Sequence, residues 1–284
     1  MTAAAKTFPY IVNWTLIFKT LHPLIAAALF SGYCFAQKLE IDLVVEKLIK
    51  DRLEAGEVGR KHRQDKIREI FNDAGCTAED QAVDKNSGNV ICTLPGESNS
   101  AIVVGAHFDF VDRGKGIVDD WSGTSMLPSL YQALKSRPRK HTYVFVAFAA
   151  EERGLIGSSL YVKKLTPDRK ADLRAFINLE CLGLTPPKIW LSRADRGLAE
   201  RLLEVAKTFQ IPMQAVNVDK VGDDDTRPFI ASKLPVITIH SLSQETLRII
   251  HSERDRMQAI HFDDYYSTYK LVAFCLAYLD VKLE

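Results

Sequence analysis

The feature that most constrains the fold of this chain is a regular alternation of short β-branched runs with longer amphipathic segments. Apolar runs bounded by turn residues predict strands, and apolar positions that repeat every three or four residues predict helices. The predicted strands are 89–94, 101–107, 142–148, 175–179, 188–192, 213–218 and 236–240. The predicted helices are two within 39–74, with a break near Gly56 and Gly59, and then 122–137, 155–165, 197–209, 228–233 and 262–281. This order is typical of an α/β protein, and we expect three α/β/α layers around a central, mostly parallel mixed sheet.

The first 36 residues differ from the rest of the 284-residue chain. They carry two positive charges, Lys6 and Lys19, and no Asp or Glu, and residues 23–36 are apolar and end in small side chains. A basic start, an apolar core and small residues before a cleavage point are typical of a signal peptide. We expect residues 1–36 to be a signal peptide cleaved after Ala36, or an uncleaved membrane anchor, followed by a single domain at 37–284. The protein is then exported, either periplasmic or secreted, or held at the membrane through its N-terminus.

The formal net charge of +1 gives the chain no long-range field that would recruit nucleic acid. We interpret the short basic run from Arg60 to Arg63 as a solvated helix face. No nucleic-acid partner is therefore expected, and a membrane contact is expected only if the N-terminal segment is uncleaved. The sequence leaves the oligomeric state open.

The five cysteines are too scattered for a thiolate metal site, because no Cys-x-x-Cys pair occurs. In an exported protein Cys76 and Cys92 form the most probable disulfide, because they bracket a polar loop that leads into a strand. Cys181 and Cys275 lie in apolar segments and are expected to be buried free thiols. Cys34 lies in the N-terminal segment.

Acids and histidines gather where the predicted strands end. In open α/β sheets, ligands bind at the carboxyl ends of the strands. The residues at or just after these ends are His107, Asp109, Asp119, Asp120, Glu151, Glu152, Glu180, His240, His251 and Asp255. Singly, each has an ordinary explanation, such as Asp119 or Asp120 capping the helix near Ser122. Together they would repel one another strongly, and a divalent cation relieves that repulsion. Mixed imidazole and carboxylate ligands suit zinc.

The strings GAHFD, DDWSG, AAEERGLIGS, NLE and HSERD, in this order and spacing, resemble the family-28 metallopeptidases. This family includes co-catalytic zinc aminopeptidases, glutamate carboxypeptidase II and the related glutaminyl cyclases, and the resemblance covers roughly residues 88–281. It implies a zinc-exopeptidase fold of the phosphorylase/hydrolase-like type. It also implies that 37–284 is a zinc-peptidase catalytic domain that hydrolyses peptide or small-protein substrates from one end, as an aminopeptidase-type hydrolase.

Position by position, the resemblance implies two zinc ions. His107 and Glu180 would hold one ion, Glu152 and His251 the other, and Asp119 would bridge them. Glu151 would be the general base that activates the metal-bridging water. Asp109 is grouped with the catalytic residues because it would fix the ring of His107. The peptide bond between Asp119 and Asp120 would be cis, as is often the case in this family.

The chain also departs from the family pattern. Glu180 stands where the family usually has Asp. Of a downstream Ser-Asp-His motif only Asp225 remains, and it either orients a site residue or belongs to a surface acidic loop. No Tyr lies between Asp219 and Phe229, so no oxyanion donor is identified. Three histidines fit no ligand position and are expected to be structural or exposed: His62, His141 and His261.

Two alternatives to the peptidase remain open. One is a glutaminyl-peptide cyclotransferase that uses a single zinc ion, and the other is a non-catalytic binding module on the same fold. The family also contains carboxypeptidases and dipeptidases, so the end of the peptide that is attacked and the preferred side chain are undecided. Manganese or cobalt would suit the same ligands as zinc.

Overall fold

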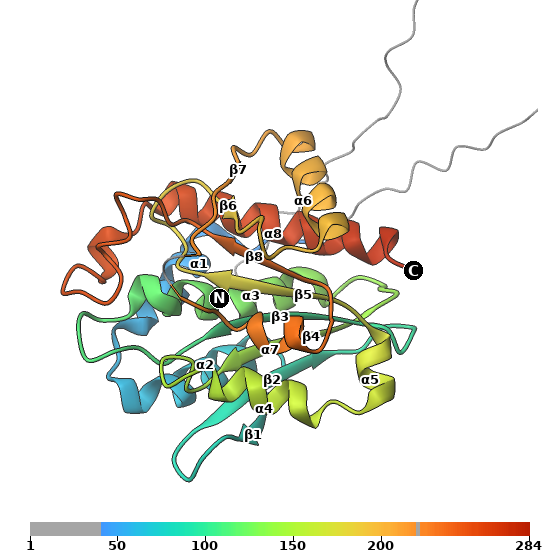
Figure 1. Ribbon diagram of the computed structural model, residues 1–284, viewed down its shortest axis with the longest axis horizontal. Helices are drawn as coiled ribbons and strands as arrows, with labels where there is room; N and C mark the ends of the chain where they lie inside the picture. The colour runs from blue at the N-terminus through green and yellow to red at the C-terminus, as the bar shows by residue number, and fades with distance from the viewer. Residues whose placement is uncertain (1–40, 220–221) are drawn as a thin grey trace, which may run out of the picture.

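A single eight-stranded sheet organises the part of the chain that the computed structural model describes, residues 41–219 and 222–284 (Figure 1). The strands follow one another across the sheet in the order β1-β2-β4-β3-β5-β8-β6-β7. Their bounds are β1 Glu79–Ala82, β2 Gly88–Leu94, β3 Ala101–His107, β4 Thr142–Phe148, β5 Leu173–Glu180, β6 Lys188–Ile189, β7 Gln214–Ala215 and β8 Val236–His240. The predicted leader or anchor at 1–36 lies outside the described residues.

The centre of the sheet is parallel. Strands β4, β3, β5 and β8 pair in parallel, β1 and β2 are antiparallel at one side, and β6 is antiparallel to β8 at the other. The carboxyl ends of the four parallel strands therefore meet at one edge, as in other open α/β sheets. The prediction of a mostly parallel mixed sheet between helical layers is confirmed.

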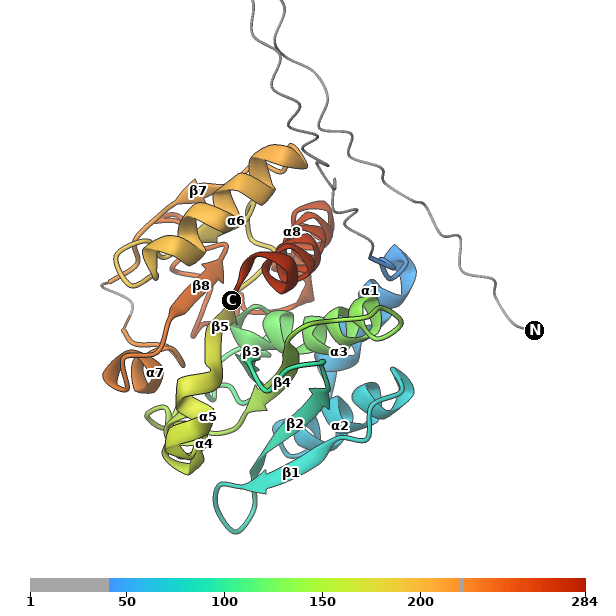
Figure 2. The same cartoon turned by 90° about the vertical axis from the view of Figure 1, so that its right-hand side faces the viewer.

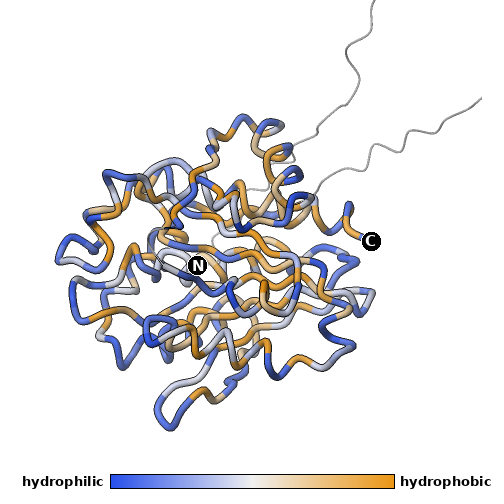
Figure 3. The backbone as a smooth tube through the Cα atoms, viewed as in Figure 1, coloured by the Kyte–Doolittle hydropathy of each residue, from blue (hydrophilic) through white to orange (hydrophobic). Residues whose placement is uncertain are grey.

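Helices cover both faces of the sheet (Figure 2). Alternate residues of β3 show why, because Ile102 and Val104 belong to the larger core while Val103 belongs to the smaller one. The larger core packs α1 Glu46–Glu54, α2 Arg63–Asp73, α3 Ser122–Leu134, α6 Arg196–Thr208 and α8 Phe262–Lys282. The smaller core packs α4 Ile156–Lys164 and α7 Arg227–Ala231. Apolar segments lie along the central strands and hydrophilic segments in the peripheral loops (Figure 3).

The break between the first two helices has a steric cause. Two short turns of 3-10 helix, Ala55–Glu57 and Arg60–His62, separate α1 from α2. A Cβ atom at Gly56 would overlap the indole ring of Trp121, so only glycine allows this close approach. Trp121 also donates from Nε1 to the main-chain carbonyl of Arg52 at 3.1 Å. The predicted break near Gly56 and Gly59 is confirmed.

Several predicted bounds differ from the structure. The strands expected at 188–192 and 213–218 shorten to the two-residue strands β6 and β7. Edge strand β1 was not predicted, since its sequence EDQA is polar and mostly exposed. Helix α5, Pro167–Asp172, was also not predicted, although Thr166 caps it and Pro167 stands at its first turn.

The basic run 60–63 is not a uniformly solvated helix face, and that expectation is wrong for its last residue. Arg60 is exposed, whereas Arg63 is fully buried. Arg63 begins α2 and shares one side of that helix with Ile67, Ile70 and Phe71, which are all buried. The helical period therefore turns this arginine inward with the apolar residues.

A disulfide joins Cys76, just after α2, to Cys92 in β2, as predicted. Cys181 and Cys275 are buried free thiols, also as predicted. Among the described residues, no helix is both long enough and apolar enough to cross a membrane.

Replacing both Cys76 and Cys92 with serine is expected to lower the melting temperature. A disulfide that closes a loop of about 15 residues contributes about 3 kcal/mol, and in a chain of this size that corresponds to roughly 6–12 °C. Thermal unfolding followed by circular dichroism measures the change. Cys275→Ala, which keeps the bridge, is the control, and a double variant that melts within 2 °C of wild type would contradict the prediction.

Candidate metal centre

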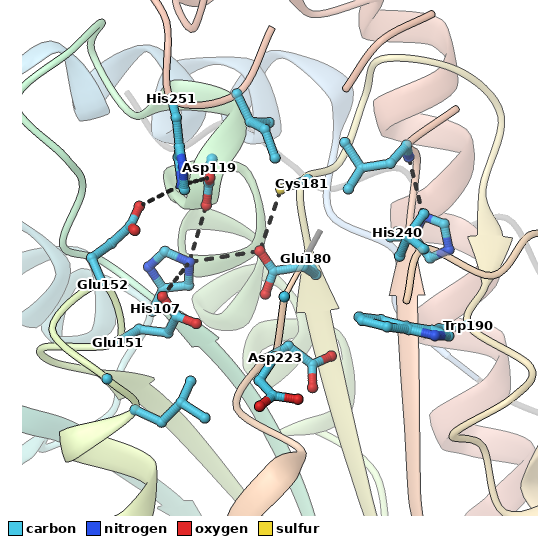
Figure 4. Close-up of a pocket in the computed structure, with 17 residues that line it drawn as sticks. His107, Asp119, Glu151, Glu152, Glu180, Cys181, Trp190, Asp223, His240 and His251 are labelled. Carbon is cyan, nitrogen blue, oxygen red and sulfur yellow. Dashed lines mark hydrogen bonds and ion pairs between the residues drawn. The ribbon is translucent and has the colours of Figure 1, made fainter. Parts of the chain in front are cut away.

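A pocket of about 430 Å³ opens at the carboxyl edge of the parallel strands (Figure 4). All of the residues predicted to act at the site line it, except Asp109. Histidines and acids make up one part of its lining, and apolar side chains make up another. The lining residues are His107, Asp119, Glu151, Glu152, Gly154, Leu155, Glu180, Cys181, Trp190, Val218, Gly222, Asp223, Asp224, His240, Leu242, Ile250 and His251.

The carboxylate of Asp119 lies between two histidines that are far apart in the sequence. Its Oδ1 is 3.1 Å from Nε2 of His107, and its Oδ2 is 3.1 Å from Nε2 of His251. Asp119 lies in the irregular turn Ile117–Trp121 that precedes α3, and its peptide bond to Asp120 is cis, as expected. Each carboxylate oxygen thus faces a different imidazole.

On one side of Asp119, His107 lies close to Glu180. The His107 Nε2 to Glu180 Oε1 distance is 3.6 Å. The other ring nitrogen of His107, Nδ1, donates to the main-chain carbonyl of Asp109 at 3.1 Å, which leaves Nε2 available as a metal ligand. Asn178 donates to the second oxygen of Glu180 at 3.3 Å. This hydrogen bond turns Oε1 toward His107.

On the other side of Asp119, Glu152 lies close to His251. The Glu152 Oε1 to His251 Nε2 distance is 3.2 Å, and the carboxylates of Asp119 and Glu152 and the His251 ring form a group that could hold a cation. The same nitrogen of His251 also lies 3.1 Å from Asp119 Oδ2, so two largely buried carboxylates share one imidazole. Buried carboxylates whose charge is incompletely compensated are costly in a protein interior, so the donor set fits a metal ion.

Glu151 lies beside these side chains but belongs to none of the three groups of described residues that could hold a metal ion. Its Oε2 is 3.9 Å from Nε2 of His107. The main-chain N–H groups of Glu151 and Glu152 donate to the two carboxylate oxygens of Asp109, at 3.0 and 3.3 Å. The Asp109 carboxylate is itself 3.8 Å from His107 Nδ1. Asp109 therefore orients His107 with its carbonyl and the Glu151–Glu152 turn with its side chain.

Burial and crowding shift the ionisation of this cluster. Burial is the main cause that raises the pKa of Glu151 to about 10, and neighbouring carboxylates add to it. Hydrogen bonds that His251 donates to the carboxylates of Asp119 and Glu152 raise its pKa to about 10. Burial opposes ionisation of His107, but Glu151, Asp119 and Glu180 outweigh it and raise its pKa well above the ordinary range. In the protein without metal, protons therefore balance the charge of the acids.

The carboxylate of Asp120 connects three segments that surround the site. Its carboxylate accepts hydrogen bonds from the main-chain N–H groups of His107, Gly123 and Cys181, at 3.3, 3.1 and 3.1 Å. These donors belong to the end of β3, the start of α3 and the residue after β5. The capping role considered for this Asp-Asp pair thus applies to Asp120, and the same carboxylate also ties two strand ends together.

Three further acids support the site, and two of them, Asp255 and Asp225, were named from the sequence without a defined role. Asp255 accepts from the N–H groups of Val118 and Asp119, at 2.7 and 3.3 Å. Asp225 is fully buried, which excludes the surface acidic loop of its two alternatives, and burial raises its pKa to about 7. Asp224, its buried neighbour, accepts from Asn178 at 3.3 Å. In the sequence, the pair Pro228-Phe229 that follows these acids was the feature that indicated an ordered segment.

The remaining histidines are placed away from the two groups. His240, at the end of β8, lines the pocket, but its Nε2 donates to the carbonyl of Val216 at 2.9 Å and burial lowers its pKa to about 4. His141 is buried against Ser100. His62 and His261 are exposed. The expectation that His62, His141 and His261 are structural or exposed is confirmed.

The backbone around the pocket is strained at several positions. Residues other than glycine rarely adopt a positive φ, and such residues often cluster at functional sites. Four pocket or pocket-edge residues adopt it: Ala150, Leu155, Cys181 and His251, with φ between 49° and 60°. These strained residues are therefore candidate metal ligands or lie close to them in the chain.

An apolar wall faces the acids across the pocket. Cys181, Trp190, Val218 and Leu242 belong to one small hydrophobic cluster, and Ile250 packs against it. The indole Nε1 of Trp190 donates to Asp219 at 3.0 Å, which fixes the ring in the pocket wall. The pocket thus combines a charged floor with a rigid apolar side.

Comparisons of sequence agree with this geometry. A model described as peptidase family M28 matches residues 89–275. The leupeptin-inactivating enzyme 1 of Streptomyces exfoliatus is 28% identical over 188 residues, which cover 64% of this chain and 42% of that protein. An aminopeptidase of Pseudomonas aeruginosa is 35% identical over 96 residues, 34% of this chain and 18% of that protein. The chain spans less than half the length of these curated relatives.

Solved structures share the fold. A zinc aminopeptidase from Bacillus subtilis matches with a TM-score of 0.62 and 24% identity, over 68% of this chain and 50% of that chain. The LapA aminopeptidase of Legionella pneumophila matches with a TM-score of 0.74 and 20% identity, over 85% and 73%. A glutaminyl cyclase from an Acidobacteriales bacterium matches with a TM-score of 0.67 and 16% identity, over 84% and 94%. At these identities the likeness shows the fold alone.

The metal-free protein is expected to lose stability as the pH rises from about 5 to 10. The pKa values of Glu151 and His251 are raised in the folded state, to about 10 each, so above the unfolded values the folded protein binds more protons than the unfolded chain. Stability then falls with rising pH. Melting temperatures of chelator-treated protein measure this. Added zinc should flatten the slope, and a metal-free melting temperature that rises across the range would contradict the prediction.

Proposed function

Because this chain belongs to peptidase family M28, we propose that it is a metal-dependent aminopeptidase that releases residues from the free N-terminus of peptides or small proteins. The proposal depends on one observation above all. The two carboxylate oxygens of Asp119 each lie 3.1 Å from a different histidine, with a further carboxylate beside each histidine. This is the arrangement that a bridging ligand between two cations requires.

Zinc suits these mixed imidazole and carboxylate donors. His107 and Glu180 would hold one ion, Glu152 and His251 the other, and Asp119 both. When bound, a pair of divalent cations polarises the scissile carbonyl and lowers the pKa of water. The longer side chain of Glu180, in place of the usual aspartate, is accommodated by its hydrogen bond from Asn178.

In this proposal Glu151 acts as the general base. Its carboxylate lines the pocket beside His107, and the Asp109 carboxylate fixes its main chain. Glu151 removes a proton from the attacking water while the water oxygen bonds to the carbonyl carbon. It then delivers that proton to the leaving amine as the C–N bond breaks. Asp109 acts by positioning Glu151 and His107.

The lining of the pocket favours the N-terminal end of a peptide. Asp223 is paired with Arg193 and Arg227, and Asp224 lies 4.0 Å from Arg193. The negative charge that suits a free α-ammonium group therefore comes from Glu151 and the carboxylates of the proposed ligands. Among the described residues that line the pocket none is Lys or Arg, which would be the usual partner of a terminal carboxylate. The apolar wall around Trp190 and Leu242 suits an apolar side chain on the released residue.

We also propose that the protein is exported. The basic and apolar segment 1–36 has the pattern of a signal peptide, and the Cys76–Cys92 disulfide suits an oxidising compartment. N-terminal sequencing of the protein recovered from the periplasm or the medium is expected to begin at Gln37. An intact Met1 on protein recovered from membranes would support an anchor, and reduced protein confined to the cytoplasm would contradict export.

The activity is tested with matched peptides. We expect zinc-loaded protein to cleave leucyl peptides with a free N-terminus, and to cleave the N-acetylated forms at least about 100-fold more slowly, because a desolvated acidic pocket discriminates against loss of the ammonium group. Mass spectrometry of the products identifies the residue released. Cleavage from the carboxyl end would contradict the aminopeptidase proposal. Loss of ammonia from N-terminal glutamine without cleavage would indicate a cyclase.

The control for this assay is Glu151→Gln. This variant keeps the proposed ligands, so it should bind the same number of metal ions, while turnover falls about 10²–10⁴-fold. His251→Gln should lose metal as well as turnover. Elemental mass spectrometry measures the stoichiometry. Near-full turnover in Glu151→Gln would remove Glu151 from the role of base, and failure of wild type to bind metal or turn over peptides would leave a binding module.

A further inference from the structure

Arg63 is a fully buried arginine that lies beneath the candidate metal centre. Its guanidinium group donates four hydrogen bonds, all to main-chain carbonyls: Gly56, Phe108, Lys115 and Gly116, at distances of 2.5–3.2 Å. A buried cation without such partners would be strongly destabilising. The four carbonyl groups therefore form a specific binding site for the guanidinium group.

Three of the four acceptors belong to the loop that connects the ligand candidates. Phe108 follows His107 directly, and Gly116 precedes the turn that carries Asp119. Lys115 lies next to Gly116, so the guanidinium binds both the beginning and the end of the loop 108–116. A single side chain thus connects both ends of the loop that separates His107 from Asp119.

Two aromatic rings enclose the guanidinium. The Arg63 Cζ atom is 4.3 Å from the ring centre of Phe110, which lies in the same loop, and 5.1 Å from that of Trp121, which ends the irregular turn. Cation–π contacts of this kind favour a charged side chain in a buried position. The rings therefore connect the guanidinium to the loop and to the turn that carries Asp119.

The charge of Arg63 also faces the acids of the site. Burial lowers its pKa to about 9, and the carboxylates of Asp255, Asp120, Asp109 and Asp119 favour its charged form. The group therefore remains a cation at neutral pH. Its helix, α2, precedes residues 89–275 that the family model matches.

We propose that Arg63 is a positioning residue of the metal centre, and that the segment before the matched region thereby completes the site. By tying both ends of the loop 108–116, Arg63 sets the spacing between His107 and Asp119 and so the affinity for metal. This inference rests on the proposed function, since it concerns the same ligands.

The test compares Arg63→Lys and Arg63→Met with Arg52→Gln in the full chain. Arg52 is the matched control because it is also a buried arginine of the N-terminal helices, but it donates to Ser129 and Gln132 on α3. Zinc affinity is measured on metal-free protein by competition with a chromophoric chelator. Cobalt absorption spectra report the ligand geometry, and kcat and KM are determined separately.

We expect Arg63→Lys to weaken zinc binding about 10–100-fold, as is usual when a residue that orients a metal ligand is lost. Its cobalt spectrum should change, and kcat should fall more than KM rises. Arg52→Gln should lose thermal stability yet keep wild-type zinc affinity and cobalt spectrum. Arg63→Met tests the charge, and if it does not fold, Arg63→Lys decides alone.

Two results would overturn the inference. One is wild-type zinc affinity in Arg63→Lys, and the other is an equal loss of affinity in Arg52→Gln, which would assign the effect to general destabilisation. Failure of the proposed function is distinguishable from both, because in that case the wild-type chain itself would bind no zinc or would release no N-terminal residue from peptides.

Discussion

Repulsion among buried carboxylates is the constraint on which the rest of this molecule depends. Asp119, Glu151, Glu152 and Glu180 line one pocket, and like charges interact strongly where water is scarce. Part of this negative charge is offset by main-chain N–H groups that donate to Asp120, Asp109 and Asp255, by two histidines and by the buried guanidinium of Arg63. Asp119 and Glu152 nevertheless share a single imidazole, that of His251. This incompletely compensated negative charge is the reason to expect cations at this place.

The topology explains how these residues meet although they are far apart in the sequence. Parallel pairing brings the ends of β3, β4, β5 and β8 to one edge, and the loops that follow those strands carry the chemistry. The same sheet supplies rigidity, because alternate strand residues are buried in two separate cores. His107 and Glu180 end strands of this sheet, Glu152 follows β4 by a short turn and Asp119 directly precedes α3, whereas His251 lies in the loop between β8 and α8.

The sequence was sufficient for the sheet, the two-sided layering and the list of residues at the strand ends, because these follow from periodicity and from one topological rule. It was insufficient for the role of Asp255 and for the burial of Arg63, because the acceptors of Arg63 at Phe108 and Gly116 and the donor to Asp255 at Val118 lie more than forty positions away. Local patterns contain no sign of such acceptors. Arg63 belongs to a basic run and was therefore expected to be solvated. Its helical spacing to Ile67 and Phe71 nevertheless places it on the buried face of α2. Asp225 was ambiguous for the same reason.

The two histidines of the site differ greatly in their access to solvent. The His251 side chain is 52% exposed, whereas that of His107 is 1% exposed. The proposed pair of cation positions is therefore kinetically unequal. A chelator or a competing ion from solution meets His251 first and reaches the His107 side only afterwards. If two ions bind as proposed, we expect the ion beside His251 to exchange with solution faster than the ion beside His107, so that loss of metal passes through a half-loaded protein.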